Sequence, residues 1–210
     1  MEEKSRNEII HYGKKILEDD LTFGAGGNLS LRYNDNMLIT PSAVPYNDLM
    51  KHEIVYMDYE GNVIKGNLKP SSEYRLHALI YENKKNAKAI IHTHSRYISV
   101  LAAINQELVA ANYLIASCGD SKVKVAPYET YGTIEFAQRA VEYLEDRKAV
   151  ILSNHGLVTY GESLEEAYSI ARDLEFCALV QVKAMAIGKL NIIPDEKIKE
   201  LVEKFKHHGQ

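Results

Sequence analysis

Apolar residues recur at every second position in several short segments, and this period predicts β-strands. The pattern is clear at residues 29–33, and short apolar runs follow at 37–40, 89–94 and 149–152. Turn residues at Asn34-Asp35-Asn36 and Glu60-Gly61 predict hairpins. Because a tight hairpin joins antiparallel strands, the sheet they form is not purely parallel.

Other segments carry apolar residues three and four positions apart, which is the period of an amphipathic helix. A serine followed three residues later by glutamate, as at Ser5 and Ser163, predicts a capping box at a helix start. The helical segments are predicted at residues 5–20, 69–80, 95–102, 133–144, 163–178 and 194–205. Strands mixed with helices along one chain predict an α/β fold with a sheet between two helical layers.

Composition and charge argue against a nucleic-acid-binding, membrane-spanning or secreted protein. The chain has 210 residues, enough for one sizeable domain, and its formal charge of −4 gives no reason to expect nucleic acid as a partner. No apolar run approaches the roughly 20 residues that span a membrane. The first residues lack a signal-peptide pattern, and Cys118 and Cys177 lack a metal-type spacing, so a cytoplasmic location with free thiols is expected.

Three histidines stand out as candidate metal ligands. His92 and His94 follow an apolar strand at spacing i, i+2, so both imidazoles face the same side. His155 follows another apolar strand and precedes a glycine, where a rigid sheet presents a turn. Three imidazoles leave one position of a tetrahedral zinc open, which is the catalytic pattern. A His-x-His pair alone is more often structural, and His11 and His52 have no such context.

Glu73 is a candidate fourth ligand, and the sequence places it in the first turn of a predicted helix, after a proline and two serines. The helix dipole already favours a carboxylate there, so capping is the competing interpretation. His77 lies four residues later on the same helical face and either orients Glu73 or packs in the core. Packing is the commoner outcome.

Two segments are suited to binding an anion. Ser71 and Ser72 offer hydroxyls and free N–H groups at a helix start. Residues 24–28, a glycine-rich run, can bring backbone N–H groups close to an anion, although alone such a run is more often a flexible turn. Together with three histidines, these segments indicate a small phosphorylated substrate.

With these motifs in place, the sequence resembles the class II aldolase/adducin family over nearly its whole length, most closely the bacterial aldolases that cleave L-fuculose 1-phosphate. The segments that carry the resemblance are Gly26-Gly27-Asn28-Leu29-Ser30, Leu38-Ile39-Thr40-Pro41, Pro70-Ser71-Ser72-Glu73, His92-Thr93-His94, Tyr113-Leu114-Ile115-Ala116, Ala126-Pro127-Tyr128 and His155-Gly156-Leu157. Their number, order and spacing make the match more specific than any one of them.

The resemblance implies one α/β/α domain over residues 1–210, with a mixed, largely antiparallel sheet and with the last helix and tail, 195–210, near the active site. It implies a homotetramer with interfacial sites and a zinc-dependent aldolase that cleaves a ketose 1-phosphate to dihydroxyacetone phosphate and an aldehyde such as L-lactaldehyde. The implied ligands of zinc are His92, His94, His155 and Glu73, and the implied catalytic residues are Glu73 and Tyr113 of a neighbouring subunit. The implied phosphate-binding residues are Gly27, Asn28, Ser42, Ala43, Ser71 and Ser72.

The chain departs from the family pattern at the edges of the substrate. Ser42-Ala43 replaces a Thr-Gly pair, and alanine resists a left-handed backbone where glycine does not. Tyr131 replaces a loop phenylalanine and His208 replaces a C-terminal tyrosine, and both are expected in the aldehyde pocket. A methylthioribulose-1-phosphate dehydratase, a ribulose-5-phosphate 4-epimerase and a non-catalytic adducin-like module are the alternatives on this scaffold.

Overall fold

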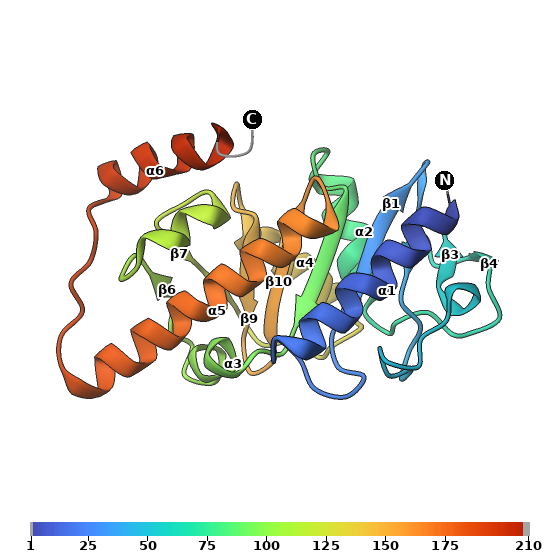
Figure 1. Ribbon diagram of the computed structural model, residues 1–210, viewed down its shortest axis with the longest axis horizontal. Coiled ribbons are helices and arrows are strands. Elements are labelled where there is room, and N and C mark those ends of the chain that lie inside the picture. Colours follow the sequence, from blue (N-terminus) through green and yellow to red (C-terminus); the bar gives the residue numbers. More distant parts are fainter. Residues whose placement is uncertain (1, 208–210) are drawn as a thin grey trace.

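A central sheet with helices on both faces organises the computed structural model, which describes residues 2–207 (Figure 1). The sheet has eight strands in the order β4-β3-β2-β1-β5-β10-β9-β8, and only β8 and β9 pair in parallel. The strands are β1 (Asn28–Tyr33), β2 (Asn36–Ile39), β3 (Val55–Met57), β4 (Val63–Lys65), β5 (Ala89–Thr93), β8 (Val125–Ala126), β9 (Ala149–Leu152) and β10 (Gly156–Gly161). The predicted three-layer α/β fold with a mixed, largely antiparallel sheet is confirmed.

The helices divide between the two faces of the sheet. They are α1 (Glu2–Glu18), α2 (Tyr74–Asn83), α3 (Arg96–Ala103), α4 (Ile134–Leu144), α5 (Leu164–Ile187) and α6 (Asp195–His207), with the 3-10 helices η1 (Lys51–Glu53) and η2 (Tyr113–Cys118). A small second sheet pairs β6 (Leu108–Val109) with β7 (Lys122–Val123). Helices α1, α3 and α5 cover one face, and α2 and α4 cover the other.

Alternation along β5 decides which face carries the chemistry. Ala89 and Ile91 pack in the core under α1, α3 and α5, whereas Ile90 packs in the core under α2 and α4. His92 follows Ile90 by two residues, so its side chain belongs to the α2 and α4 face. Asn28 is the residue directly opposite His92 on β1. The end of β5 therefore places a histidine and an amide side by side beneath α2.

Two helix starts differ from the sequence prediction. The expected start of the first helix at Ser5 is wrong, because α1 already begins at Glu2, where the Glu2 carboxylate pairs with Arg6 one turn later at 2.8 Å. Helix α2 begins at Tyr74, so Glu73 is its N-cap and not a residue of its first turn. At Ser163 the prediction holds, since its hydroxyl accepts the Glu166 N–H at 3.1 Å.

The last helix, α6, packs against η2 with Ile198 buried at the contact. Its approach to an active site stays a prediction, and His208 lies outside the described residues. None of the helices within residues 2–207 is long and apolar enough to cross a membrane. The expected cytoplasmic location also stays a prediction.

Candidate metal centre and active site

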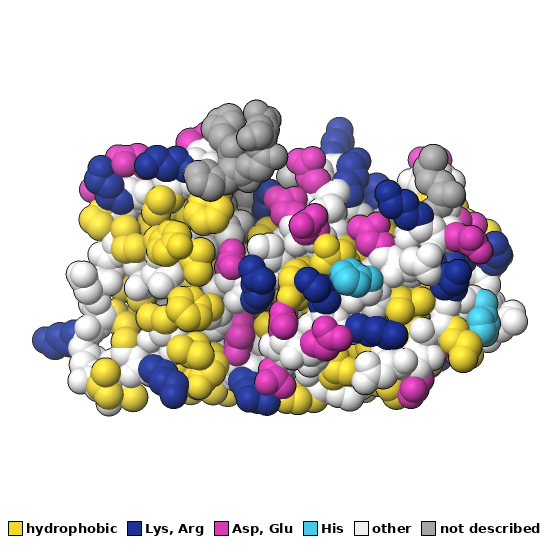
Figure 2. Space-filling view, viewed as in Figure 1, with side chains coloured by type: hydrophobic (Ala, Val, Ile, Leu, Met, Phe, Trp, Pro, Cys, Tyr) yellow, Lys and Arg dark blue, Asp and Glu magenta, His cyan; other side chains and the backbone are white. Residues whose placement is uncertain are grey.

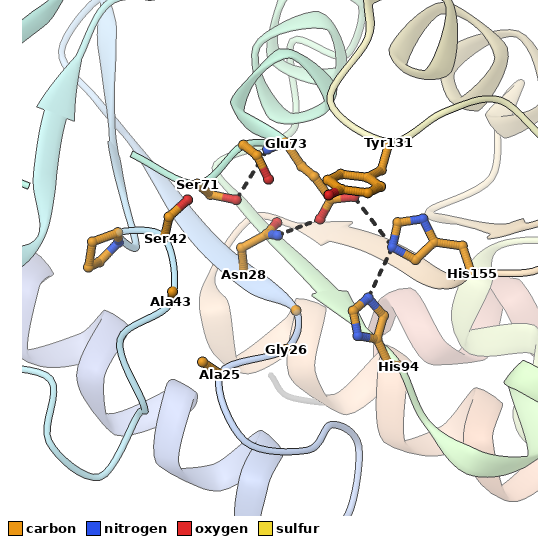
Figure 3. Close-up of a pocket in the computed structure, with 13 residues that line it drawn as sticks. Ala25, Gly26, Asn28, Ser42, Ala43, Ser71, Glu73, His94, Tyr131 and His155 are labelled. Carbon is orange, nitrogen blue, oxygen red and sulfur yellow. Dashed lines mark hydrogen bonds and ion pairs between the residues drawn. The ribbon is translucent and has the colours of Figure 1, made fainter. Parts of the chain in front are cut away.

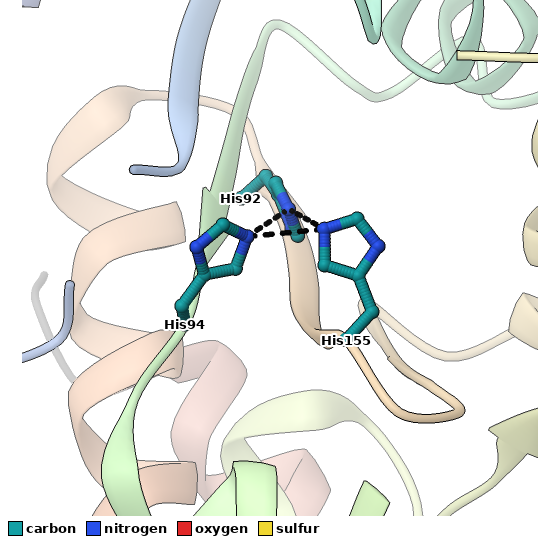
Figure 4. A group of neighbouring side chains, drawn as sticks. All are labelled: His92, His94 and His155. Atoms are coloured by element: carbon teal, nitrogen blue, oxygen red, sulfur yellow. Dashed lines mark hydrogen bonds between the residues drawn. The ribbon is translucent and has the colours of Figure 1, made fainter. Parts of the chain in front are cut away.

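The three histidines selected from the sequence converge on one point (Figure 4). The Nε2 atom of His92 lies 2.9 Å from that of His94 and 3.2 Å from that of His155, and the remaining pair is 3.1 Å apart. His92 comes from the end of β5, His94 from the residue after it and His155 from the turn between β9 and β10. These distances are close to the spacing of three ligands on one tetrahedral ion.

The surroundings keep these imidazoles neutral. The Nδ1–H of His92 donates to the Leu157 carbonyl at 2.9 Å, which leaves the Nε2 lone pair facing the other two rings. Burial lowers the pKa of His92 well below its ordinary value and that of His155 to about 3, and burial also lowers the pKa of His94. With the proton of each neutral ring on Nδ1, three Nε2 lone pairs face one point and repel one another unless a cation lies between them. The cluster therefore offers the neutral nitrogen donors that a divalent metal ion requires.

Glu73 stands over the same point. Its Oε2 lies 3.3 Å from His92 Nε2 and its Oε1 lies 3.4 Å from His155 Nε2. The Asn28 amide donates to Oε2 at 2.7 Å, whereas Oε1 is buried with no hydrogen-bond partner among the described residues. A buried carboxylate oxygen without a donor is costly unless a cation or a proton satisfies it. Glu73 is thus placed both to ligate an ion and to hold a proton.

A cavity of about 240 Å³ opens beside this cluster (Figure 3). Most residues selected from the sequence for the substrate line it. The lining residues are Ala25, Gly26, Gly27, Asn28, Pro41, Ser42, Ala43, Ser71, Ser72, Glu73, His94, Tyr131 and His155. All six expected phosphate-binding residues therefore share one cavity with Glu73 and two of the histidines.

Backbone pairing brings the two anion-binding loops together. The N–H of Ser42 donates to the Lys69 carbonyl and the N–H of Ser71 donates to the Thr40 carbonyl, each at 3.0 Å. These bonds continue the sheet beyond β2, and a bridge joins Pro41 with Pro70. The N–H groups of Gly27, Ala43 and Ser72 have no acceptor within the described part of the chain. Free N–H groups around a cavity are suited to an anion.

Two positions in this cavity require a left-handed backbone. Gly27 has φ +71°, and a Cβ there would lie 2.4 Å from the His92 carbonyl oxygen. Only glycine permits this approach of the loop to β5. Ala43 has φ +61°, so the departure from glycine noted in the sequence does place an alanine in the region that alanine resists.

The turn that carries His155 is supported from two sides. Phe136 on α4 stacks on the imidazole, and Asn154 donates its N–H to the Ala102 carbonyl at the end of α3 at 3.1 Å. The Ser153 hydroxyl donates to the Asn105 side chain at 2.6 Å. Phe136 could not be selected from the sequence, because one aromatic residue on an amphipathic helix has the pattern of an ordinary core residue.

Other expected residues lie elsewhere. Tyr131 lines the cavity, with its ring centroid 6.4 Å from that of His155. Tyr113 begins η2, is 53% exposed and does not line the cavity of its own chain. His11 and His52 are exposed, as expected of surface residues. His77 is fully buried and hydrogen-bonded at both ring nitrogens, so it does more than pack.

The fold and the site define a class of α/β protein with a three-histidine cluster beside a cavity lined by free backbone N–H groups, and comparison with known proteins identifies the family. A model of the class II aldolase and adducin N-terminal domain matches residues 7–182. The chain belongs to the class II aldolase and adducin family.

Individual relatives match over nearly the whole chain. The chain is 39% identical over 210 residues to 5-deoxy-D-ribulose 1-phosphate aldolase of Bacillus thuringiensis serovar kurstaki, covering 99% of this chain and 98% of the relative. It is 37% identical over 207 residues to L-fuculose phosphate aldolase of Escherichia coli K12, covering 98% and 96%. A solved structure of L-fuculose 1-phosphate aldolase superposes with a TM-score of 0.94 at 40% identity, covering 97% of this chain and 96% of that one. The prediction of an enzyme, a lyase of the class II aldolase type, is confirmed.

Proposed function

We propose that the protein is a zinc-dependent aldolase that reversibly cleaves a ketose 1-phosphate to dihydroxyacetone phosphate and a short aldehyde. The observation that carries this proposal is the convergence of three Nε2 atoms within 3.2 Å, with both Glu73 oxygens 3.3 to 3.4 Å from them. Beside that cluster lies a cavity with free backbone N–H groups. A Lewis acid, a proton carrier and an anion site are the three elements that the reaction needs.

The donor set fits a divalent ion. Three neutral imidazoles and one carboxylate suit zinc, although the same set also accepts cobalt or manganese. The orphan Oε1 of Glu73 is the atom that an ion would satisfy. When bound, the ion acts as a Lewis acid that stabilises the negative charge on the dihydroxyacetone phosphate half as the carbon–carbon bond breaks.

Glu73 is the proposed general acid and base. In the cleavage direction it gives a proton to the carbon that carries the new electron pair, and in the synthetic direction it removes that proton. The Asn28 N–H holds Oε2, so Oε1 would ligate the ion while the cavity is empty and would be free to carry the proton once the substrate has displaced Glu73 from the ion. Such a group must lie within hydrogen-bond reach of the reacting carbon's proton, and Glu73 lines the cavity beside the histidines.

The loops of the cavity are the proposed phosphate site. The N–H groups of Gly27, Ala43 and Ser72, the Ser71 hydroxyl and the Asn28 amide belong to residues that line the cavity. Ser42 lines it too, with its hydroxyl donating to the Pro70 carbonyl at 3.0 Å. Among the described residues no lysine or arginine lines the cavity, so backbone and hydroxyl donors would carry the recognition. This arrangement would fix the 1-phosphate and set the distance from phosphate to reacting carbon.

A homotetramer with interfacial sites is part of the proposal. Tyr113, the proposed proton donor to the aldehyde-side oxygen, does not line its own chain's cavity and would have to come from a second copy. Figure 2 shows hydrophobic side chains close together over the C-terminal half of α5. Three residues of that helix, Phe176, Met185 and Ile187, are at least 42% exposed. Exposed apolar surface of this kind suits subunit contacts.

Two substrates have support from relatives. L-Fuculose 1-phosphate is the first candidate, and 5-deoxyribulose 1-phosphate is the second because one relative at 39% identity carries that name. Both yield dihydroxyacetone phosphate and differ only in the aldehyde. Tyr131 and His208 are the residues proposed to meet that aldehyde.

Release of dihydroxyacetone phosphate from the two ketose phosphates, coupled to a reductase that consumes it, tests the proposal. We expect release with one of them, loss of it after chelation and its return with zinc. Loss of water from methylthioribulose 1-phosphate, or epimerisation of ribulose 5-phosphate, without release of dihydroxyacetone phosphate would instead assign the dehydratase or epimerase alternative.

A further inference from the structure

Helix α2 and strand β1 interlock through a row of polar side chains behind the candidate metal centre. Glu73, His77 and Tyr81 are spaced four apart at the start and along one face of α2, and Asn28 and Ser30 are spaced two apart on the facing side of β1. Four helical residues rise about 6 Å, and two strand residues rise about 6.7 Å. The two sets of side chains therefore have nearly the same spacing along α2 and β1, so residues of the helix and of the strand alternate along the row.

Hydrogen bonds run along this row without a gap. Starting at the metal centre, the contacts are Glu73 Oε2 to Asn28 Nδ2 at 2.7 Å, Asn28 Oδ1 to His77 Nε2 at 2.5 Å, His77 Nδ1 to Ser30 Oγ at 2.6 Å, and Ser30 Oγ to Tyr81 Oη at 2.8 Å. Asn28 is 3% exposed, Tyr81 is 1% exposed, and Ser30 and His77 are fully buried. Water does not compete for these bonds.

The donor at each step follows from the chemistry of the groups. The Glu73 carboxylate accepts, so the Asn28 amide must donate Nδ2–H to it and turn Oδ1 toward His77. His77 must then carry its proton on Nε2. Its Nδ1 has a lone pair, so the Ser30 hydroxyl donates to it and in turn accepts from the Tyr81 hydroxyl.

The burial of His77 and Tyr81 keeps both groups in the protonation states that this direction requires. Burial lowers the pKa of His77 to about 3, so the ring is neutral and has a single N–H. Burial also raises the pKa of Tyr81, so the phenol keeps its proton. The Tyr81 hydroxyl can therefore donate to Ser30, which leaves the Ser30 proton for His77 Nδ1. The resulting Nε2–H tautomer of His77 matches the Asn28 orientation that donates to Glu73.

We propose that His77, with Ser30 and Tyr81 behind it, is a positioning residue that fixes the orientation of the Asn28 amide. In that orientation one Asn28 N–H holds Glu73 Oε2, and the second is available on the cavity side, where Asn28 forms part of the wall. The opposite orientation would set Oδ1 against the Glu73 carboxylate, two acceptors at hydrogen-bond distance. The role of Glu73 in proton transfer, on which this inference rests, is that of the proposed function.

A double-mutant cycle tests the coupling. We expect His77→Leu, which keeps the bulk and removes both ring nitrogens, to lower kcat about 10- to 100-fold, the range for partners behind a reacting group. The same change made in an Asn28→Ala protein should have little further effect, because the residue through which His77 acts is gone. Equal loss of kcat in both backgrounds would overturn the proposal, since a purely structural role is additive.

Two further variants distinguish a specific loss of kcat from a folding defect. Ser30→Ala removes only the hydroxyl that fixes the His77 tautomer, and we expect it to lower kcat with thermal unfolding still cooperative. Tyr59→Phe is the matched control, because Tyr59 stacks on Tyr81 and bonds Arg32 outside the row. Its kcat should match that of the wild type. A Ser30→Ala enzyme with wild-type kcat would contradict the proposal.

Nitrogen-15 NMR of histidine-labelled protein without metal supplies a readout that needs no turnover. His77 should show the Nε2–H tautomer, and Ser30→Ala should convert a fraction to Nδ1–H. An Nδ1–H tautomer in the wild type would overturn the proposed donor and acceptor assignment along the row of hydrogen bonds. If the wild type shows the Nε2–H tautomer but cleaves no ketose phosphate, the proposed function fails while the row of hydrogen bonds stands.

Discussion

Phe136 on α4 stacks its ring on the imidazole of His155, with the centroids 5.4 Å apart and the planes 25° apart. Among the three histidines, His155 is the one that comes from a turn, and its Nδ1 has no hydrogen-bond partner among the described residues. The aromatic contact thus takes the place of the carbonyl that orients His92. It links the helical layer on one face of the sheet to the geometry of the metal centre.

Replacing Phe136 should therefore weaken metal binding. Phe136→Leu keeps an apolar side chain but removes the flat surface, and we expect the affinity for zinc to fall about tenfold, as for other groups that orient a ligand. Competition with a chromogenic chelator measures it. Phe176→Leu, at an exposed position on α5, is the control. Unchanged affinity in a folded Phe136→Leu protein would show that the stacking does not orient the ligand.

Gly27 and Gly24 form a matched pair in the same loop. Both have positive φ, but a Cβ at Gly27 would lie 2.4 Å from the His92 carbonyl oxygen, whereas a Cβ at Gly24 meets no atom within 4 Å. We expect Gly27→Ala to displace the loop from β5 and raise KM for the ketose phosphate at least tenfold. Gly24→Ala should cost only backbone strain, about 1 kcal/mol of stability, with KM unchanged. Equal KM values in the two variants would remove Gly27 from the phosphate site.

Ala43 offers a stabilising substitution. Because alanine is strained at φ +61° and glycine is not, Ala43→Gly should raise the free energy of unfolding by about 1 kcal/mol. For a chain of this size the melting temperature should rise by roughly 2–4 °C. Ala25→Gly, at a lining residue with ordinary φ, should lower it. A lower melting temperature for Ala43→Gly in differential scanning calorimetry would show that the backbone at Ala43 is not strained.

His77 gives a prediction on pH and stability. Its pKa is about 3 in the folded chain and about 6.5 when unfolded, so the unfolded state binds the proton first as pH falls. Its contribution to stability is complete above pH 6.5 and decreases below it, by about 2 kcal/mol between pH 8 and pH 5. Urea unfolding of the metal-free wild type and His77→Gln at both pH values measures this. The stability difference between them should shrink by that amount, and a constant difference would refute it.

The strands and the three histidines could be predicted because their signals are local. A period of two along β5 places His92 and His94, and a turn between two apolar runs presents His155. The start of α1 could not be located, since Ser5 and Glu8 fit a capping box equally well inside a helix. The row from Glu73 to Tyr81 was also missed. It depends on the alignment of α2 with β1, between residues at least 45 positions apart, and no local pattern encodes that alignment.

The proposed role of Glu73 is to add or remove a proton at the carbon of dihydroxyacetone phosphate that forms the new bond, with an ion held by the three histidines. Proton exchange at that carbon in D2O, followed by proton NMR without any aldehyde, tests it directly and does not depend on the identity of the aldehyde. We expect the zinc-loaded wild type to exchange one proton, and the chelated wild type and zinc-loaded Glu73→Gln to exchange none at a measurable rate. Exchange by Glu73→Gln at the wild-type rate, or no exchange by the zinc-loaded wild type, would contradict this role of Glu73.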